Sequence, residues 1–205
     1  SPASHTDTDG GEGGNDPAQC GSWGAPEVVG AVSDAELDEI SGIAVSRQSP
    51  GVLWVHEDSG AGPILTALST TGTTIATLRL RGASSTDWED VAIAPCGDVD
   101  CLWVGDFGDN SSRRTDVTLL RVEEPTIDSD GSELEATADT IAYAYAEGPQ
   151  DAEALVVTDD GQPYVLTKRT DATSHIYRVP VDGSGVAERV STIGTGTTDG
   201  LPTAT

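Results

Sequence analysis

Carboxylate side chains gather in four short motifs of this sequence, each beside the beginning or the end of an apolar run. The motifs are His56-Glu57-Asp58-Ser59, Asp87-Trp88-Glu89-Asp90, Asp106-Phe107-Gly108-Asp109-Asn110 and Asp151-Ala152-Glu153. Crowded carboxylates repel one another unless a proton or a cation neutralises them, and calcium prefers hard oxygen ligands of this kind. The motifs therefore predict a calcium site. Its candidate ligands are Glu57, Asp58, Asp87, Glu89, Asp90, Asp106, Asp109, Asn110, Asp151 and Glu153.

A second interpretation stays open for the same residues. Asp, Asn and Gly are also the residues that tight turns use, and one such motif alone would favour a turn. Their occurrence at matching points of a repeat favours cation binding. His56 is the only imidazole within the motifs, which disfavours zinc.

Four of the ten basic residues lie near these motifs. Arg113 and Arg114 follow the third motif, and Lys168 and Arg169 follow a later apolar run. These side chains could hold an anionic ligand, such as a phosphate bridged to calcium, or they could form salt bridges with the nearby carboxylates. The sequence contains no Gly-x-Ser-x-Gly, phosphate-loop or His-Glu-x-x-His motif, so no catalytic residue is assigned.

The elements that must position these residues repeat along the chain. Strand-like runs occur in the same order three times, at residues 40–46, 52–60 and 63–68, at 88–94, 101–109 and 117–122, and at 151–157, 163–169 and 175–180. Each set is followed by one more run, at 73–80, 138–145 and 185–193. Four short strands in roughly 45 to 60 residues are typical of a propeller blade. The sequence therefore predicts an all-β protein, a β-propeller of four-stranded antiparallel blades, within residues 26–205.

About three blades are expected, over residues 40–80, 88–145 and 151–193, and residues 27–32 are expected to form a strand that completes another blade. A short helix is a candidate for residues 33–40. Three blades do not close a ring, so either the chain lacks blades or a second chain supplies them through the open blade edges. Trp54 and Trp103 occupy the same place in successive second strands, which indicates packing between blades.

The blade topology also predicts where the acidic motifs lie. Two motifs stand at the beginning of first strands, which line the central channel, and two follow second strands. In an up-and-down blade, the beginning of the first strand and the end of the second strand lie on the same face. All four motifs are therefore expected at one mouth of the funnel.

Charge and cysteines indicate the compartment. The formal net charge of −25 disfavours a nucleic-acid partner, and no apolar run is long enough to predict a transmembrane segment. Cys96 and Cys101 enclose a short polar turn and are expected to form a disulfide, which implies an oxidising compartment; Cys20 is left over. Residues 1–25 are acidic and lack large aliphatic side chains, so they predict a flexible linker. The chain begins at Ser1 and not at Met, so a processed, secreted, extracellular or periplasmic protein is expected, with the linker as a candidate surface tether.

Several spaced motifs resemble a group of largely uncharacterised bacterial secreted β-propellers, similar in style to phytase-like and esterase-like, WD40-like propellers. The matching segments are residues 87–92, 102–110, 121–125, 151–155 and 167–169. In propeller phytases, acidic side chains at the funnel hold calcium ions that bind phosphate, and Asp151-Ala152-Glu153 looks like the Asp-x-Glu that begins one of their blades. Ala154 stands where those enzymes favour Gly.

Two functions follow from these observations. The first is a secreted, calcium-binding propeller that serves as an extracellular or cell-surface interaction module. The alternative is a calcium-dependent hydrolase of phosphate esters or lactones at the funnel mouth, which requires a metal with an open coordination position.

Overall fold

The computed structural model describes residues 24–58, 60, 62–127 and 131–194, and these residues form thirteen strands and no helix. The strands are β1 (Ile40–Val45), β2 (Val52–Glu57), β3 (Ile64–Ser69), β4 (Thr74–Arg81), β5 (Trp88–Pro95), β6 (Asp100–Asp106), β7 (Val117–Glu123), β8 (Ser132–Thr137), β9 (Asp139–Tyr145), β10 (Ala152–Val157), β11 (Pro163–Thr167), β12 (Thr173–Arg178) and β13 (Val186–Gly194). The predicted linker falls mainly in residues 1–23, which lie outside the described residues, as does Cys20. Within the described residues, no helix has the length and apolarity needed to cross a membrane.

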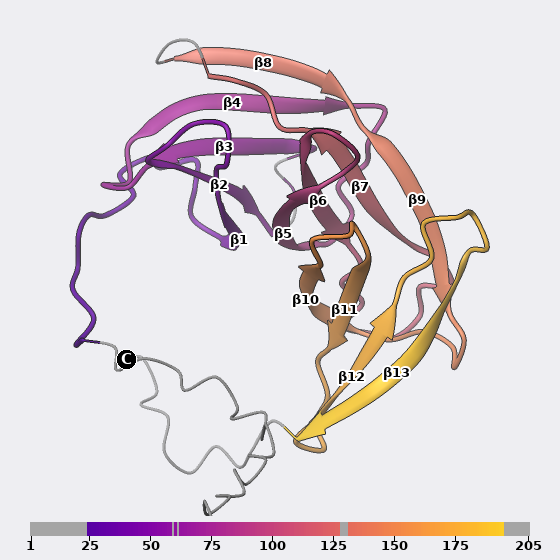
Figure 1. Ribbon diagram of the computed structural model, residues 1–205. Coiled ribbons are helices and arrows are strands. Elements are labelled where there is room, and N and C mark those ends of the chain that lie inside the picture. Colours follow the sequence, from indigo (N-terminus) through magenta and orange to yellow (C-terminus); the bar gives the residue numbers. More distant parts are fainter. Residues whose placement is uncertain (1–23, 59, 61, 128–130, 195–205) are drawn as a thin grey trace, which may run out of the picture.

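Three four-stranded antiparallel units follow one another along the chain. Blade 1 is β1-β2-β3-β4, blade 2 is β5-β6-β7-β9, and blade 3 is β10-β11-β12-β13. Figure 1 shows them as an arc, with the first strands β1, β5 and β10 innermost and the last strands at the perimeter. Strand β5 contacts both β1 and β10. The predicted all-β propeller architecture is confirmed, with three blades in a partial ring.

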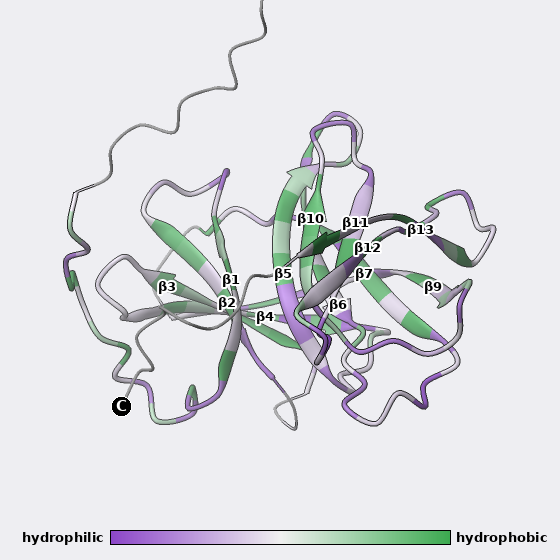
Figure 2. Cartoon of the chain, turned by 90° about the horizontal axis from the view of Figure 1, so that it is seen from below, coloured by the Kyte–Doolittle hydropathy of each residue, from purple (hydrophilic) through white to green (hydrophobic). Residues whose placement is uncertain are grey.

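The hydrophobic core lies between blades, because each blade has an apolar face that must be covered by its neighbour. Trp54, Leu78 and Trp88 belong to the cluster between blades 1 and 2, while Trp103 and Tyr177 belong to the cluster between blades 2 and 3. Figure 2 shows hydrophobic residues concentrated along the strands. Trp54 and Trp103 are both almost completely buried, which confirms their predicted packing between blades.

Each innermost strand has a β-bulge at the same place. The register shifts between Ile40 and Gly42 in β1, between Trp88 and Asp90 in β5, and between Ala152 and Ala154 in β10. The extra residues are Ser41, Glu89 and Glu153. A bulge changes the direction of the side chain that it carries, so equivalent positions of the three blades present Ser, Glu and Glu near the beginning of the innermost strand.

Two parallel pairings join the blades at the perimeter. Strand β8 leaves blade 2 and pairs with β4 of blade 1, from Ala76 opposite Ser132 to Arg81 opposite Thr137. Strand β13 of blade 3 pairs with β9 of blade 2 through Val186 and Ala187. Sequence reasoning did not predict β8, and its pairing covers the outer edge of blade 1.

The face opposite the acidic motifs carries two further constraints. The predicted disulfide between Cys96 and Cys101 is confirmed and links β5 to β6 across a Cα–Cα distance of 5.8 Å. Glu124, which follows β7 of blade 2, is buried and reaches into blade 1. Its carboxylate accepts hydrogen bonds from Ser46 Oγ (2.5 Å) and Trp54 Nε1 (3.0 Å), and from the backbone N–H groups of residues 47 (3.1 Å) and 48 (3.2 Å).

The segment before β1 differs from expectation. Residues 27–32 form no strand, and Val28 and Val29 are 95% and 73% exposed, so the predicted blade-completing strand is wrong for this structure. The candidate helix at 33–40 is also absent, because the Asp34 side chain accepts a hydrogen bond from the Glu36 N–H and closes a turn. The segment passes close to the β3–β4 turn, where a Cβ on Gly30 would lie 2.3 Å from a backbone oxygen.

The outer faces of blades 1 and 3 are exposed to solvent. The strand registers place Ile43, Val91 and Leu155 at equivalent positions. Val91 is 3% and Leu155 6% exposed between blades, whereas Ile43 is 59% exposed. Likewise Ala44 is 9% exposed in blade 1, but its equivalent in blade 3, Val156, is 50% exposed. Blades 1 and 3 thus expose, at the two ends of the arc, the kinds of surface that pack against each other between neighbouring blades.

Candidate cation-binding site

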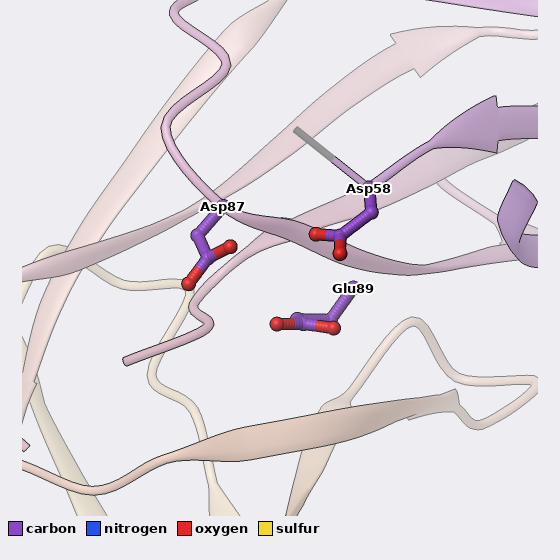
Figure 3. Close-up of side chains that lie close together, drawn as sticks. All are labelled: Asp58, Asp87 and Glu89. Atoms are coloured by element: carbon purple, nitrogen blue, oxygen red, sulfur yellow. The ribbon is translucent and has the colours of Figure 1, made fainter. Parts of the chain in front are cut away.

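Five carboxylates from three blades meet at one mouth of the arc. Asp58 follows β2, Asp87 and Asp151 precede β5 and β10, and Glu89 and Glu153 are the bulge residues of those strands. They form two groups, Asp58–Asp87–Glu89 and Glu89–Asp151–Glu153, and in each group one oxygen per residue lies within 4.8 Å of the others. Figure 3 shows the first group, with the three carboxylates drawn close together.

Backbone hydrogen bonds fix the positions of these residues across the blade boundaries. The Trp88 N–H donates to the Asp58 carbonyl (3.1 Å), which ties the end of β2 to the beginning of β5. The Asp109 N–H donates to Asp151 Oδ1 (2.9 Å), which ties the loop after β6 to the beginning of β10. The cluster of five carboxylates is therefore connected across all three blades by hydrogen bonds from backbone N–H groups.

Glu89 is the central member and belongs to both groups. It is 7% exposed, and its carboxylate has no hydrogen-bond donor among the described residues. Burial, and then the nearby carboxylates of Glu153, Asp87, Asp58 and Asp151, raise the pKa of Glu89 to about 8. Ionised carboxylates at this spacing require a neutralising proton or cation.

The Asp58–Asp87–Glu89 group also contains a buried oxygen without a hydrogen-bond partner among the described residues. Asp58 Oδ1 is inaccessible to solvent and has no hydrogen-bond partner. The pKa of Asp87 is raised, chiefly by burial and then by the charge of Asp58, although the Arg114 guanidinium lowers it. Unpaired buried carboxylate oxygens are costly, so this group has the electrostatic character of a cation site.

Gly108 allows the loop after β6 to lie directly against the cluster. A Cβ at this position would lie 2.1 Å from Glu89 Oε1 and 2.6 Å from Asp87 Oδ2. Sequence reasoning placed Gly108 inside a motif but assigned it no role. The close approach depends on the folded path of the loop, and no local sequence signal reveals it.

The structure does not bring Asp106 and Asp109 into the two groups. Asp106 is 1% exposed, accepts hydrogen bonds from the N–H groups of Thr86 and Asp87 (both 3.2 Å), and forms a 2.9 Å ion pair with Arg114. Asp109 Oδ2 accepts a 2.6 Å hydrogen bond from the Arg114 N–H. These two predicted ligands instead shape the loop that carries Gly108.

Three further predicted ligands also lie outside the two groups. Glu57 Oε2 accepts a 2.9 Å hydrogen bond from the Glu39 N–H. Asp90 accepts from the Leu155 N–H (2.7 Å), which connects blade 2 to blade 3, and burial raises its pKa. Asn110 is exposed. Sequence alone could not separate Glu89 from Asp90, because the bulge decides which neighbour turns toward the mouth.

The four basic residues have different partners. Lys168 Nζ lies 2.7 Å from Glu153 Oε1, Arg169 pairs with Asp171 at 2.8 Å, and Arg114 also donates to the Gly108 carbonyl (2.9 Å). Arg113 is exposed and has no ion-pair partner within the described part of the chain. The salt-bridge interpretation thus describes Arg114, Lys168 and Arg169. Of these three, Lys168 alone pairs with one of the five clustered carboxylates.

The fold defines the class of protein only. The strand pairing makes it an all-β protein built of propeller blades. No protein-family model matches the chain, and no curated protein matches it. A solved structure of the PQQ-bound form of aldose sugar dehydrogenase from Streptomyces coelicolor is similar with a TM-score of 0.40 and 12% sequence identity, over 82% of this chain and 70% of that chain. A likeness of this size carries no information about the chemistry of the site.

Proposed function

We propose that this chain is a calcium-binding β-propeller module whose cation site is the five-carboxylate cluster at one mouth. The observation that carries the proposal is Glu89, a buried carboxylate without a hydrogen-bond donor, in contact range of Asp58, Asp87, Asp151 and Glu153. A bound divalent cation would let all five ionise at neutral pH, because it replaces mutual repulsion with attraction.

The chemistry of the donors favours a hard cation such as calcium over zinc. The two groups contain carboxylate oxygens alone, with no imidazole or thiolate, and hard oxygen donors suit calcium, whereas zinc prefers nitrogen and sulfur. His56 belongs to neither group; its ring lies 5.6 Å from that of Trp88, and burial lowers its pKa.

The position of the cluster suggests what the cation does. Asp58 belongs to blade 1, Glu89 to blade 2 and Glu153 to blade 3, so a cation in contact with these side chains would cross-link the blades. Such a clamp suits an extracellular or cell-surface interaction module. The Cys96–Cys101 disulfide is compatible with secretion, and the motif resemblance to secreted bacterial propellers supports the same assignment.

Calcium-dependent hydrolysis of phosphate esters or lactones is the alternative. The observation in its favour is the position of Lys168 at the edge of the cluster, where an ammonium and a metal could hold one anionic group. A calcium that keeps two or more water ligands facing solvent would favour hydrolysis, while full enclosure by protein oxygens would favour the structural role.

Calcium titration tests the proposal. We expect calcium to raise the melting temperature of the full chain and EDTA to reverse the effect, because a ligand that binds only the folded state stabilises it. Glu89→Gln should abolish most of the calcium effect. Glu133→Gln, an exposed glutamate on the perimeter strand β8, is the matched control and should retain it. A melting temperature that is the same in calcium and in EDTA would refute calcium binding, and phosphatase and lactonase assays on the same samples test the alternative.

A further inference from the structure

The two carboxylate groups share Glu89 but differ in their surroundings. In the Asp58–Asp87–Glu89 group, no lysine or arginine forms an ion pair with any of the three members within the described residues. In the Glu89–Asp151–Glu153 group, Lys168 Nζ lies 2.7 Å from Glu153 Oε1, and Asp151 Oδ1 accepts the Asp109 N–H. The first group therefore has no ion-pair partner of its own among the described residues, while the second already contains a positive charge.

Lys168 occupies the position in blade 3 that Asp58 occupies in blade 1. Glu57 pairs with Ile40 and Thr167 pairs with Ala152, in each case next to the bulge, so the residues that follow them are equivalent. Their backbones make the same contact: the Asp58 N–H donates to the carbonyl of residue 39 (3.0 Å), and the Lys168 N–H donates to the Asp151 carbonyl (2.9 Å). Blade 3 thus has an ammonium where blade 1 has a carboxylate.

We propose that Lys168 is a resident counter-cation that makes the cluster bind two divalent cations with unequal affinity. The first cation binds at the Asp58–Asp87–Glu89 group. The second binds at the Glu89–Asp151–Glu153 group only when the Lys168 ammonium leaves Glu153. This inference rests on the proposed calcium function and adds the order of binding and the residue that sets it.

The structure allows this displacement without a change in the main chain. The Lys168 backbone is held by its hydrogen bond to Asp151, while its side chain is 56% exposed and that of Glu153 is 36% exposed. An ion pair this exposed contributes little free energy, so a divalent cation can compete with it. The released ammonium would stay beside the second cation, where it could contact an anionic ligand.

Calorimetric titration with calcium chloride tests the inference on the full chain. We expect two binding steps for the wild type. Lys168→Gln should strengthen the weaker step by about five- to tenfold, because it removes both a competitor and a like charge, and should leave the tighter step nearly unchanged. Arg169→Gln is the matched control. It removes the same charge one residue away, but from a side chain that pairs with Asp171, and it should change neither step by more than about twofold.

A chemical measurement on the unmutated protein gives an independent readout. Lys168 is the only lysine of the chain, so acylation of an ε-amino group, followed by peptide mass mapping, reports on this residue alone. We expect slow acylation in EDTA, little change with the first equivalent of calcium, and faster acylation as the second equivalent binds.

The possible failures are distinguishable. If the wild type binds no calcium, the proposed function and this inference both fall. If calcium binds but Lys168→Gln behaves like Arg169→Gln, or acylation is unchanged throughout the titration, the counter-cation role is refuted while the calcium site stands.

Discussion

Replacing Glu89 with glutamine changes how the stability of the cation-free protein depends on pH. Burial and four neighbouring carboxylates raise the pKa of this group from 4.5 to about 8. The folded protein therefore holds the Glu89 proton more tightly than the unfolded chain does. The stability that this proton contributes is fully present below pH 4.5 and is lost as the pH rises toward 8.

The size of the loss follows from the same pKa. One pKa unit corresponds to about 1.4 kcal/mol, so the interval from 4.5 to about 8 sets an upper value of roughly 5 kcal/mol. The neighbouring Asp87, Asp151 and Glu153 are partly exposed, so solvent screens part of this interaction. We therefore expect the free energy of unfolding to fall by about 2 to 4 kcal/mol between pH 5 and pH 8 because of this one group.

Urea denaturation in EDTA at pH 5 and pH 8 measures this change for the wild type and for Glu89→Gln. The variant has no titrating group at this position and should lose correspondingly less stability. The pKa values of Asp87 and Asp90 are also raised, but both groups are present in the two proteins, so the difference between the proteins isolates Glu89. Equal slopes for the two proteins would refute the electrostatic argument, and Glu133→Gln should match the wild type.

Three other predictions follow from contacts described above. Gly108→Ala should weaken calcium binding at least tenfold in a titration, because the new methyl group displaces the Glu89 and Asp87 carboxylates. The urea midpoint should change little, because the methyl group does not displace the backbone. An unchanged calcium affinity would contradict the close approach of Gly108 to the carboxylates. Glu124→Gln should lower the free energy of unfolding by about 1 to 3 kcal/mol in urea denaturation, because the amide cannot replace every hydrogen bond that the buried carboxylate accepts; a change below about 0.5 kcal/mol would contradict this role. The chain should self-associate through the two exposed outer faces of blades 1 and 3, since Val156 is exposed at a position that is buried between blades 1 and 2. Val156→Lys should therefore reduce the mass measured by light scattering. A wild-type protein that is monomeric at every concentration would contradict this self-association.

The blades could be predicted from the sequence because their signals are local and repeat. Alternating apolar residues and turn residues mark twelve of the thirteen strands found among the described residues. Strand β8 was missed because Ser132–Thr137 is polar and its partner, β4, lies in another blade. Residues 27–32 were wrongly predicted as a strand because valine-rich composition indicates strand propensity, whereas a strand also needs a neighbour with free hydrogen-bonding groups.

The sequence predicted where the acidic side chains gather, and the binding of a cation there stays a prediction. The blade topology placed all four acidic motifs at one mouth, and the structure brings Asp58, Asp87, Glu89, Asp151 and Glu153 together there. Which acidic residues join the two carboxylate groups and which have other partners was not predictable. Asp106 forms an ion pair with Arg114, and Asp90 accepts a hydrogen bond from the Leu155 N–H. Both contacts depend on the bulge and on the paths of the loops, which composition and spacing do not encode.

The pairing of β8 with β4 has a consequence for the order in which the protein forms. All four strands of blade 1 have been synthesised by Arg81, yet the strand that covers its outer edge ends at Thr137, after three strands of blade 2. The nascent chain must therefore keep an open sheet edge until much of the next blade has emerged from the ribosome. Blades 1 and 2 should consequently unfold together, and the β4 amide protons that face β8 should exchange with solvent only when β8 separates from β4.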